Sequence, residues 1–216
     1  MPQRLSHIEA ASVPVVAVTA WQMLFEYGDA KPNQTVIILG AGGNVGAYAV
    51  QLAVRSKLHV IAIAPSKDLE YVKRLGGKRV LDYRTDELES FAGSVDLVID
   101  TVGGEARERA SRVLKPGGVL VSVVSVGAPP NRPDVRSVFF YVDVTSARLE
   151  AITALLDRGE LVPRVGTVLP LEQVRAAHEM LAGAPHERWL ILKSTIGRTM
   201  FDAPVSLSPR EPSTDY

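Results

Sequence analysis

Residues 35–46 read TVIILGAGGNVG, and this segment gives the strongest indication of the fold. The apolar run from Val36 to Leu39 is typical of a short strand buried on both faces of a parallel sheet. A glycine-rich turn over residues 40–46 follows it, and a helix is predicted over residues 45–55. The first N–H groups of such a helix have no partner within the helix, and together with its dipole they favour an anion.

Two glycine spacings fit this turn. The first uses Gly40, Gly43 and Gly46, and the second uses Gly40 and Gly42 with Val45 in place of the third glycine. In either spacing one glycine makes the turn and another lets the backbone approach a pyrophosphate, while Gly46 allows helix and strand to lie close together. The strand-turn-helix context therefore predicts a dinucleotide site.

Strand-like and helix-like segments alternate on both sides of this turn, which predicts right-handed crossovers and a parallel sheet. The predicted fold class is α/β, a Rossmann-type doubly wound parallel sheet of six strands with helices on both faces. Its strands are expected at residues 36–39, 58–64, 79–81, 95–99, 119–126 and 137–142. Its helices are expected at residues 45–55, 67–75, 104–114 and 146–157. A further helix over residues 9–27, bent at Pro14, is predicted after a capping box formed by Ser6 and Glu9.

The character of the chain changes after Gly159. A strand, a helix and a second strand are expected as a small appended unit, over residues 165–169, 171–181 and 189–193. The rest of the chain is rich in Ser, Pro and charge without periodicity, so a disordered tail is predicted. The predicted organisation is a lead-in segment (1–33), a dinucleotide-binding domain (34–160), a return segment (161–193) and the tail (194–216).

The composition excludes several classes of function. Lys plus Arg and Asp plus Glu both number 24, so a neutral chain of 216 residues is expected to bind neither nucleic acid nor a membrane surface. Cysteine is absent and the four histidines lack the spacing of a metal-binding motif, so no metal site is predicted. No secretory signal or membrane-spanning run is identified, which predicts a cytoplasmic protein.

The end of the second predicted strand bears on the choice of dinucleotide. A site specific for NAD would place an acid there to bind the ribose hydroxyls, but this chain has Ala64. Ser66 and Lys67 follow and can donate to a 2′-phosphate, whereas Asp68 is expected inside the first helical turn, where it suits the helix dipole. The sequence therefore favours NADP(H) over NAD(H).

An ordered set of motifs extends over residues 6–193. It comprises PVVAVTAW (14–21), AVQLA (49–53), LGG (75–77), LDYR (81–84), VDLVIDTVGG (95–104), LKPGG (114–118), PL (170–171) and AAH (176–178). This set resembles the medium-chain dehydrogenase/reductase superfamily, and within it the zinc-independent NADPH:quinone oxidoreductase branch. The resemblance implies hydride transfer between NADP(H) and a small quinone, enone, alkene or aldehyde. No general acid is identified, so no catalytic residue is named.

The resemblance also implies a set of cofactor-binding residues. Thr19 matches a threonine near the nicotinamide end, and Thr101 and Val102 match strand ends that line the nicotinamide ribose. Ser66, Lys67 and Tyr83 match positions that face the adenosine phosphate. The remaining members are the loop residues Gly40, Ala41, Gly42, Gly43, Asn44, Val45 and Gly46, and the predicted strand end Ser125, Val126 and Gly127.

Members of that family carry an N-terminal catalytic domain that has no counterpart in this sequence. The resemblance therefore implies a truncated oxidoreductase whose return segment, 161–193, exposes apolar surface, and a separate chain could supply the catalytic domain. It also implies a homodimer through the strand at residues 137–142, because an apolar sheet edge is a natural pairing surface.

Two other functions remain open on the sequence alone. The chain could be a non-catalytic dinucleotide-binding module or half of a split enzyme. A methyltransferase is a more remote alternative, because the run Leu114 to Gly118 recurs in that class, but Ala64 stands where such enzymes carry an acid.

Overall fold

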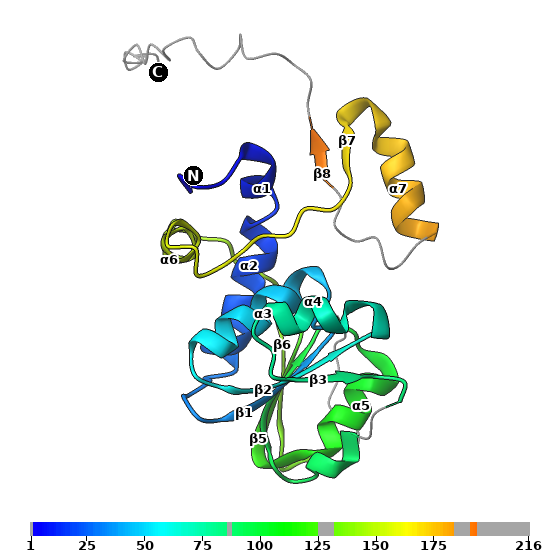
Figure 1. Ribbon diagram of the computed structural model, residues 1–216. Coiled ribbons are helices and arrows are strands. Elements are labelled where there is room, and N and C mark those ends of the chain that lie inside the picture. Colours follow the sequence, from blue (N-terminus) through cyan, green and yellow to red (C-terminus); the bar gives the residue numbers. More distant parts are fainter. Residues whose placement is uncertain (1, 86–87, 125–131, 184–190, 194–216) are drawn as a thin grey trace, which may run out of the picture.

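A six-stranded sheet forms the centre of the protein, and the computed structural model describes residues 2–85, 88–124, 132–183 and 191–193 (Figure 1). All neighbouring strands are parallel and the strand order is β3-β2-β1-β4-β5-β6. This order confirms the predicted Rossmann-type sheet. The strands are β1 (Thr35–Leu39), β2 (His59–Ala64), β3 (Arg79–Asp82), β4 (Val95–Asp100), β5 (Leu114–Ser122) and β6 (Arg136–Phe139).

Helices cover both faces of the sheet (Figure 1). One face is covered by α2 (Pro14–Trp21), α3 (Asn44–Arg55), α4 (Leu69–Arg74) and α6 (Ser146–Asp157). The other is covered by α5 (Gly104–Arg112) and the 3₁₀ turn η3 (Leu88–Phe91). A second 3₁₀ turn, η2 (Ser66–Asp68), leads into α4.

Side chains of the central strands alternate between two hydrophobic clusters. On β1, Val36 and Ile38 belong to the cluster under α2, α3 and α6, whereas Ile37 and Leu39 belong to the cluster under α5. All four are fully buried, as expected for a strand covered on both sides. The continuous apolar run therefore encodes a central strand, and the glycine turn after it lies at the carboxyl edge of the sheet.

The N-terminal segment differs from the single bent helix predicted over residues 9–27. The capping box is present, since the Ser6 hydroxyl accepts the Glu9 N–H and the Glu9 carboxylate accepts the Ser6 N–H. However, α1 (His7–Ala11) ends before Pro14, which is the first residue of α2. Pro14 fits there because the first helical residue has no intrahelical N–H bond to lose. Residues Gln22–Tyr27 then form a π-helix, η1, a change in hydrogen-bond register that apolar periodicity does not reveal.

Strand β5 begins earlier than predicted. The run 115–118 was expected to be a turn before a strand at 119–126, but it is a bulge within β5. Pairing with β4 shifts between Val95 and Leu97, Gly117 adopts φ +77°, and its N–H donates to the Asp134 carbonyl. The glycine allows the chain to leave the ladder and rejoin it at Val119.

The sixth strand is shorter than predicted, because it ends at Phe139 rather than at residue 142. Phe140 is buried and its ring stacks on Tyr27 at 4.2 Å. Tyr141, the next residue, is 84% exposed.

The C-terminal unit is the predicted strand-helix-strand appendage (Figure 1). It contains β7 (Val168–Pro170), the 3₁₀ turn η4 (Leu171–Gln173), α7 (Val174–Gly183) and β8 (Ile191–Lys193), and β7 pairs with β8 in parallel. Strand β7 is shorter than the strand predicted over residues 165–169, and β8 covers the described part of the strand predicted over residues 189–193. The predicted tail at residues 194–216 lies outside the described residues.

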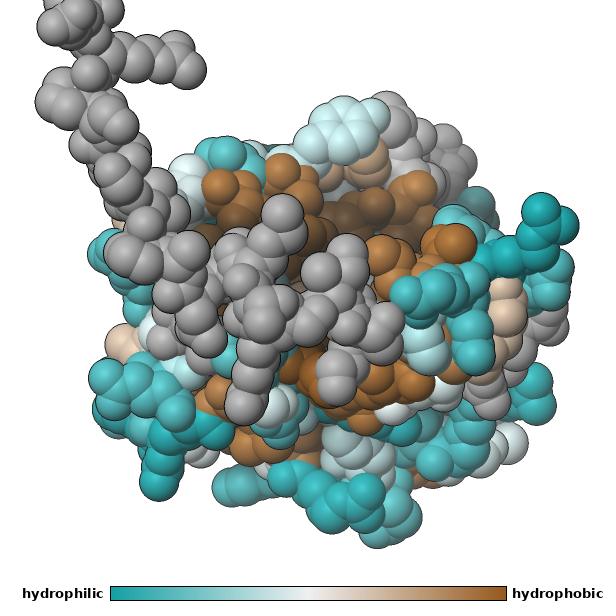
Figure 2. Space-filling view, turned by 90° about the horizontal axis from the view of Figure 1, so that it is seen from above, coloured by the Kyte–Doolittle hydropathy of each residue, from teal (hydrophilic) through white to brown (hydrophobic). Residues whose placement is uncertain are grey.

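Apolar surface gathers on the face seen from above (Figure 2). Large exposed apolar side chains of the C-terminal unit and the segment before it are Val162, Val168, Leu171 and Val174. Their exposure agrees with the expected apolar surface on residues 161–193. Among the described residues, none of the helices has the length and apolar character needed to span a membrane.

Candidate functional site

The glycine turn holds the start of α3 directly against the end of β1. Gly40 adopts φ +74°, and a side chain there would overlap the hydroxyl of Thr101. A Cβ on Gly46 would overlap the Gly40 carbonyl oxygen. Gly43 is the N-cap of α3, and its N–H donates to the Gly40 carbonyl at 2.8 Å. The helix N-terminus is thus brought close to the strand end, with its dipole available to an anion.

A cavity of about 1110 Å³ opens beside this turn. It lies at the carboxyl ends of β1, β2, β3 and β4, where ligands bind in open parallel sheets. The first turns of α5 and the segment at 164–167 complete its wall. Its volume is slightly above the usual range of about 300–1,000 Å³ for small-molecule sites, which suits an extended ligand such as a dinucleotide.

Asp100, the last residue of β4, shapes the wall at the loop between β4 and α5. It is fully buried, and its Oδ1 accepts the N–H groups of Val102 (3.0 Å) and Gly103 (2.8 Å). Its Oδ2 accepts the Ser122 hydroxyl at 2.7 Å and lies 3.7 Å from Nε of the buried Arg107. One carboxylate therefore joins β4, β5, α5 and the loop that lines the cavity.

A second carboxylate, Asp82, lies at the end of β3 and lines the same cavity. Its Oδ2 accepts the Ser66 hydroxyl, and its Oδ1 accepts the Arg84 N–H at 3.0 Å. These bonds hold the pKa of the Asp82 carboxyl below its usual value, so the group is ionised at neutral pH. Asp82 thus connects the turn after β2 with the turn after β3.

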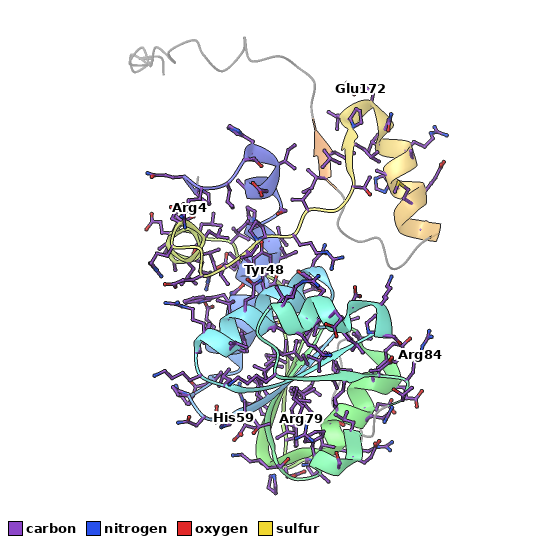
Figure 3. All side chains as sticks on the ribbon, in the orientation of Figure 1. Arg4, Tyr48, His59, Arg79, Arg84 and Glu172 are labelled. Carbon is purple, nitrogen blue, oxygen red and sulfur yellow. The ribbon has the colours of Figure 1, made fainter. Side chains whose placement is uncertain are left out.

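Two cationic side chains extend from these two turns. Lys67 in η2 and Arg84 in the turn after β3 both line the cavity and are exposed (Figure 3 labels Arg84). Arg84 Nε donates to the Tyr83 hydroxyl at 2.8 Å. Neither Lys67 nor Arg84 makes a salt bridge with another described residue, so both charges are available to an anionic ligand.

Asp68 has a more specific place than the helix-dipole interpretation predicted. It ends η2 and lies directly against the glycine turn, since a Cβ on Gly42 would come within 2.7 Å of the Asp68 Cβ. Its Oδ1 is 4.0 Å from Nη1 of Arg164, whose guanidinium lies 4.2 Å from the Tyr71 ring centroid. The segment before β7 therefore supplies a cation beside the glycine turn.

The structure brings about half of the described candidate cofactor residues to the cavity. Those that line it are Gly40, Gly42, Gly43, Lys67, Tyr83, Thr101 and Val102. Those that do not line it are Thr19, Ala41, Asn44, Val45, Gly46 and Ser66. Thr19 is buried, and its hydroxyl donates to the Val15 carbonyl at 2.7 Å. Ser125, Val126 and Gly127 lie outside the described residues.

Several cavity residues were missed by reasoning from the sequence. The charged ones are Asp82, Arg84, Glu105, Arg109 and Arg164. A signal for Asp82 existed, because it directly follows an apolar run predicted as a strand whose carboxyl end meets the same edge of the sheet. No local pattern pointed to Arg164, which is far from the glycine turn in the sequence.

Comparison with known proteins gives a consistent result. A family model described as zinc-binding dehydrogenase matches residues 75–187, more than half of the chain. A probable mitochondrial zinc-binding oxidoreductase of Arthroderma benhamiae is 30% identical over 213 residues, which cover 89% of this chain and 64% of that protein. The human mitochondrial NAD(P)H oxidoreductase RTN4IP1 is 28% identical over a region that covers 82% of this chain and 53% of that protein. The chain thus spans between half and two thirds of the length of these relatives.

A solved structure agrees with the sequence comparisons. The quinone oxidoreductase from Coxiella burnetii matches with a TM-score of 0.81 and 28% identity, over 88% of this chain and 62% of that chain.

Proposed function

Because the chain belongs to the zinc-binding dehydrogenase family, we propose that it binds a nicotinamide dinucleotide in this cavity and acts as an oxidoreductase. The observation that carries the proposal is the glycine turn, which places the N-terminus of α3 at a large cavity along the carboxyl edge of the sheet. When bound, a nicotinamide would supply the hydride. The residues of this chain would bind and orient the dinucleotide.

The described residues fit a dinucleotide but not zinc. The chain has no cysteine, and no cluster of three potential His, Asp or Glu ligands occurs among the described residues. A zinc site needs three or four such ligands in a compact geometry. The proposed reaction therefore uses no zinc bound by this part of the chain.

The proposed cofactor is NADP(H) in preference to NAD(H). Lys67 and Arg84 extend from two neighbouring turns at the ends of β2 and β3, and a doubly charged phosphate is attracted more strongly than a hydroxyl to such a pair. The proposed substrate is a small quinone, enone or aldehyde, the classes that the family resemblance implies. A cytoplasmic location stays a prediction from the sequence.

A homodimer through β6 is also proposed. This strand is at the edge of the sheet, and the neighbouring Phe139 and Tyr141 rings meet edge to face at 5.2 Å. Phe139 is partly buried and Tyr141 is 84% exposed, and an edge strand beside such an exposed ring favours pairing with a second copy.

Two measurements test the proposed function. Titration calorimetry with NADPH and NADH measures affinity, and NADPH oxidation in the presence of a small quinone measures turnover. Binding of both nucleotides, tighter for NADPH, together with oxidation supports the proposal. Binding without oxidation would instead identify a non-catalytic binding module, and the absence of binding would contradict the proposed site.

The methyltransferase alternative finds no support at this site. The run Leu114 to Gly118 that suggested it is the bulged part of β5 and does not line the cavity. Binding of S-adenosylmethionine in the same calorimetric experiment would be the result that restores it.

A further inference from the structure

We propose that Asp82 limits the cofactor specificity of the site. It reduces the difference in binding affinity between a nucleotide with a 2′-phosphate and one with a 2′-hydroxyl. The inference rests on the proposed dinucleotide site and concerns its adenosine end. Asp82 was not among the residues that the sequence indicated. Its position and its hydrogen bonds both bear on how the site reads the 2′ position.

The position of Asp82 follows from the register of the sheet. In a Rossmann sheet the adenosine ribose lies at the carboxyl end of the second strand, where an acid confers preference for NAD. Here that strand ends at Ala64, but Ala64 pairs with Asp82 in β3, and the Tyr83 N–H continues the ladder to the Ala64 carbonyl. Neighbouring strands lie about 4.8 Å apart. The carboxylate missing from β2 is therefore supplied one strand away, at the same level.

The hydrogen bonds of Asp82 occupy the donor that was expected to serve the phosphate. A serine hydroxyl has one proton to donate, and Ser66 donates it to Asp82 Oδ2. Ser66 itself does not line the cavity, whereas Asp82 does. The turn after β2 thus presents one donor fewer to a 2′-phosphate than its sequence suggests.

Charge acts in the same direction. Asp82 is ionised and lines the cavity, so its negative charge acts on a ligand bound there. It repels a 2′-phosphate and leaves a neutral 2′-hydroxyl unaffected or favoured. Lys67 and Arg84 attract the phosphate from the same two turns. The balance gives a site that prefers NADP(H) modestly and accepts NAD(H).

The test compares two small nucleotides that contact only the adenosine end. Calorimetry measures the affinities of the full chain for adenosine 2′,5′-bisphosphate and for 5′-AMP. The ratio of the bisphosphate affinity to the 5′-AMP affinity reports on the 2′ group alone. In Asp82→Asn the amide oxygen can still accept the Arg84 N–H, while the charge is lost and Ser66 is released. This variant is expected to raise the ratio about tenfold, with the affinity for 5′-AMP unchanged.

A double-mutant cycle identifies the part played by Ser66. Ser66→Ala alone is expected to leave the ratio within about twofold of the wild type, because in the wild type the Ser66 hydroxyl donates its hydrogen bond to Asp82 and not to the phosphate. The same change in the Asp82→Asn background is expected to lower the ratio several-fold, because the released hydroxyl then serves the phosphate. Ser66 is exposed, so its replacement tests the proposal even if Asp82→Asn does not fold.

The possible outcomes separate this inference from the proposed function. If Asp82→Asn leaves the ratio unchanged or lowers it, or if Ser66→Ala alone lowers it several-fold, the role of Asp82 is refuted while the dinucleotide site stands. If the wild type binds neither nucleotide, the proposed function fails as well.

Discussion

Gly46 illustrates how a missing side chain shapes the site at the scale of a single residue. It does not line the cavity, yet a Cβ at this position would overlap the Gly40 carbonyl oxygen. Its contribution is to let α3 begin close to the end of β1, so that the helix N-terminus faces the cavity. This is the close helix-strand contact that the glycine spacing predicted.

Gly46→Ala is expected to lower the free energy of unfolding by about 1–3 kcal/mol, because the helix must shift to accommodate the methyl group. Urea denaturation measures this change. Gly43→Ala is a matched control, since its Cβ would lie 3.1 Å from the same oxygen, and its effect should be smaller. Equal stability of Gly46→Ala and the wild type would contradict the proposed close contact.

Lys67→Glu is expected to weaken NADPH binding at least tenfold while changing NADH binding by less than about threefold, because the substitution reverses a charge near the 2′ group. Titration calorimetry with both nucleotides provides the measurement. Lys78→Glu makes the same change in charge just before β3, at the opposite end of the sheet, and should leave both affinities unchanged. Equal losses for the two nucleotides would show that Lys67 does not read the 2′ group.

At the scale of secondary-structure elements, charged side chains connect pieces that are distant in sequence. Asp100 joins β4 to β5 and α5, and Arg148 joins α6 to the π-helix η1. The first connection is buried and fixes a cavity wall, whereas the second is partly exposed. The two are expected to respond differently to mutation and to pH.

Asp100→Ala is expected to destabilise the protein by about 3–5 kcal/mol, because it leaves the Arg107 guanidinium buried without its carboxylate. The change is measured by urea denaturation. Asp134→Ala removes one partner of an exposed ion pair with Arg132 and should cost at most about 1 kcal/mol. Similar effects of the two substitutions would contradict the special role of the buried pair.

The contact between Glu26 and Arg148 is expected to depend on pH. Hydrogen bonds from Arg148, at 2.8 Å to each carboxylate oxygen, lower the pKa of Glu26 from its ordinary value of 4.5. The contact therefore stabilises fully above pH 4.5, and its contribution is lost as pH falls through the lower pKa of the folded state.

The measurement is the difference in unfolding free energy between wild type and Glu26→Gln, followed from pH 7 to pH 3. We expect the wild type to be more stable at pH 7 and the difference to shrink below pH 4.5. Glu150→Gln on the exposed side of α6 is the control. A difference that grows as pH falls would show that the sign is wrong.

At the scale of the whole molecule, the edge of the sheet formed by β6 is the proposed dimer surface. Light scattering is expected to give a mass about twice the chain mass of 23.3 kDa. Tyr141→Arg should reduce the mass to that of one chain, because it replaces an 84% exposed aromatic ring beside that edge with a positive charge. Val162→Arg alters another exposed apolar side chain and should leave the mass unchanged. A monomeric wild type would contradict the proposal.

Local sequence patterns were sufficient to predict the class of fold, and the same patterns led to the proposed site. Apolar runs of strand length, the glycine turn after Val36 to Leu39 and the intervening helical segments were sufficient for a parallel sheet with a site at its carboxyl edge. These features are local: a fully buried strand needs apolar residues on both faces, and a tight turn into a helix needs glycine. The family resemblance rested on the order of the same local motifs.

Which side chains meet at the proposed site, and how their charges balance, depends on contacts between distant parts of the chain. The register of β2 against β3 places Asp82 beside Ala64, where its carboxylate accepts a hydrogen bond from the Ser66 hydroxyl. The sequence alone suggested that this hydroxyl donates to a phosphate. The chain returning after α6 places Arg164 beside Asp68. Strand register and the return of distant segments are long-range properties, because they depend on how whole elements fit together rather than on the residues next to the glycine turn.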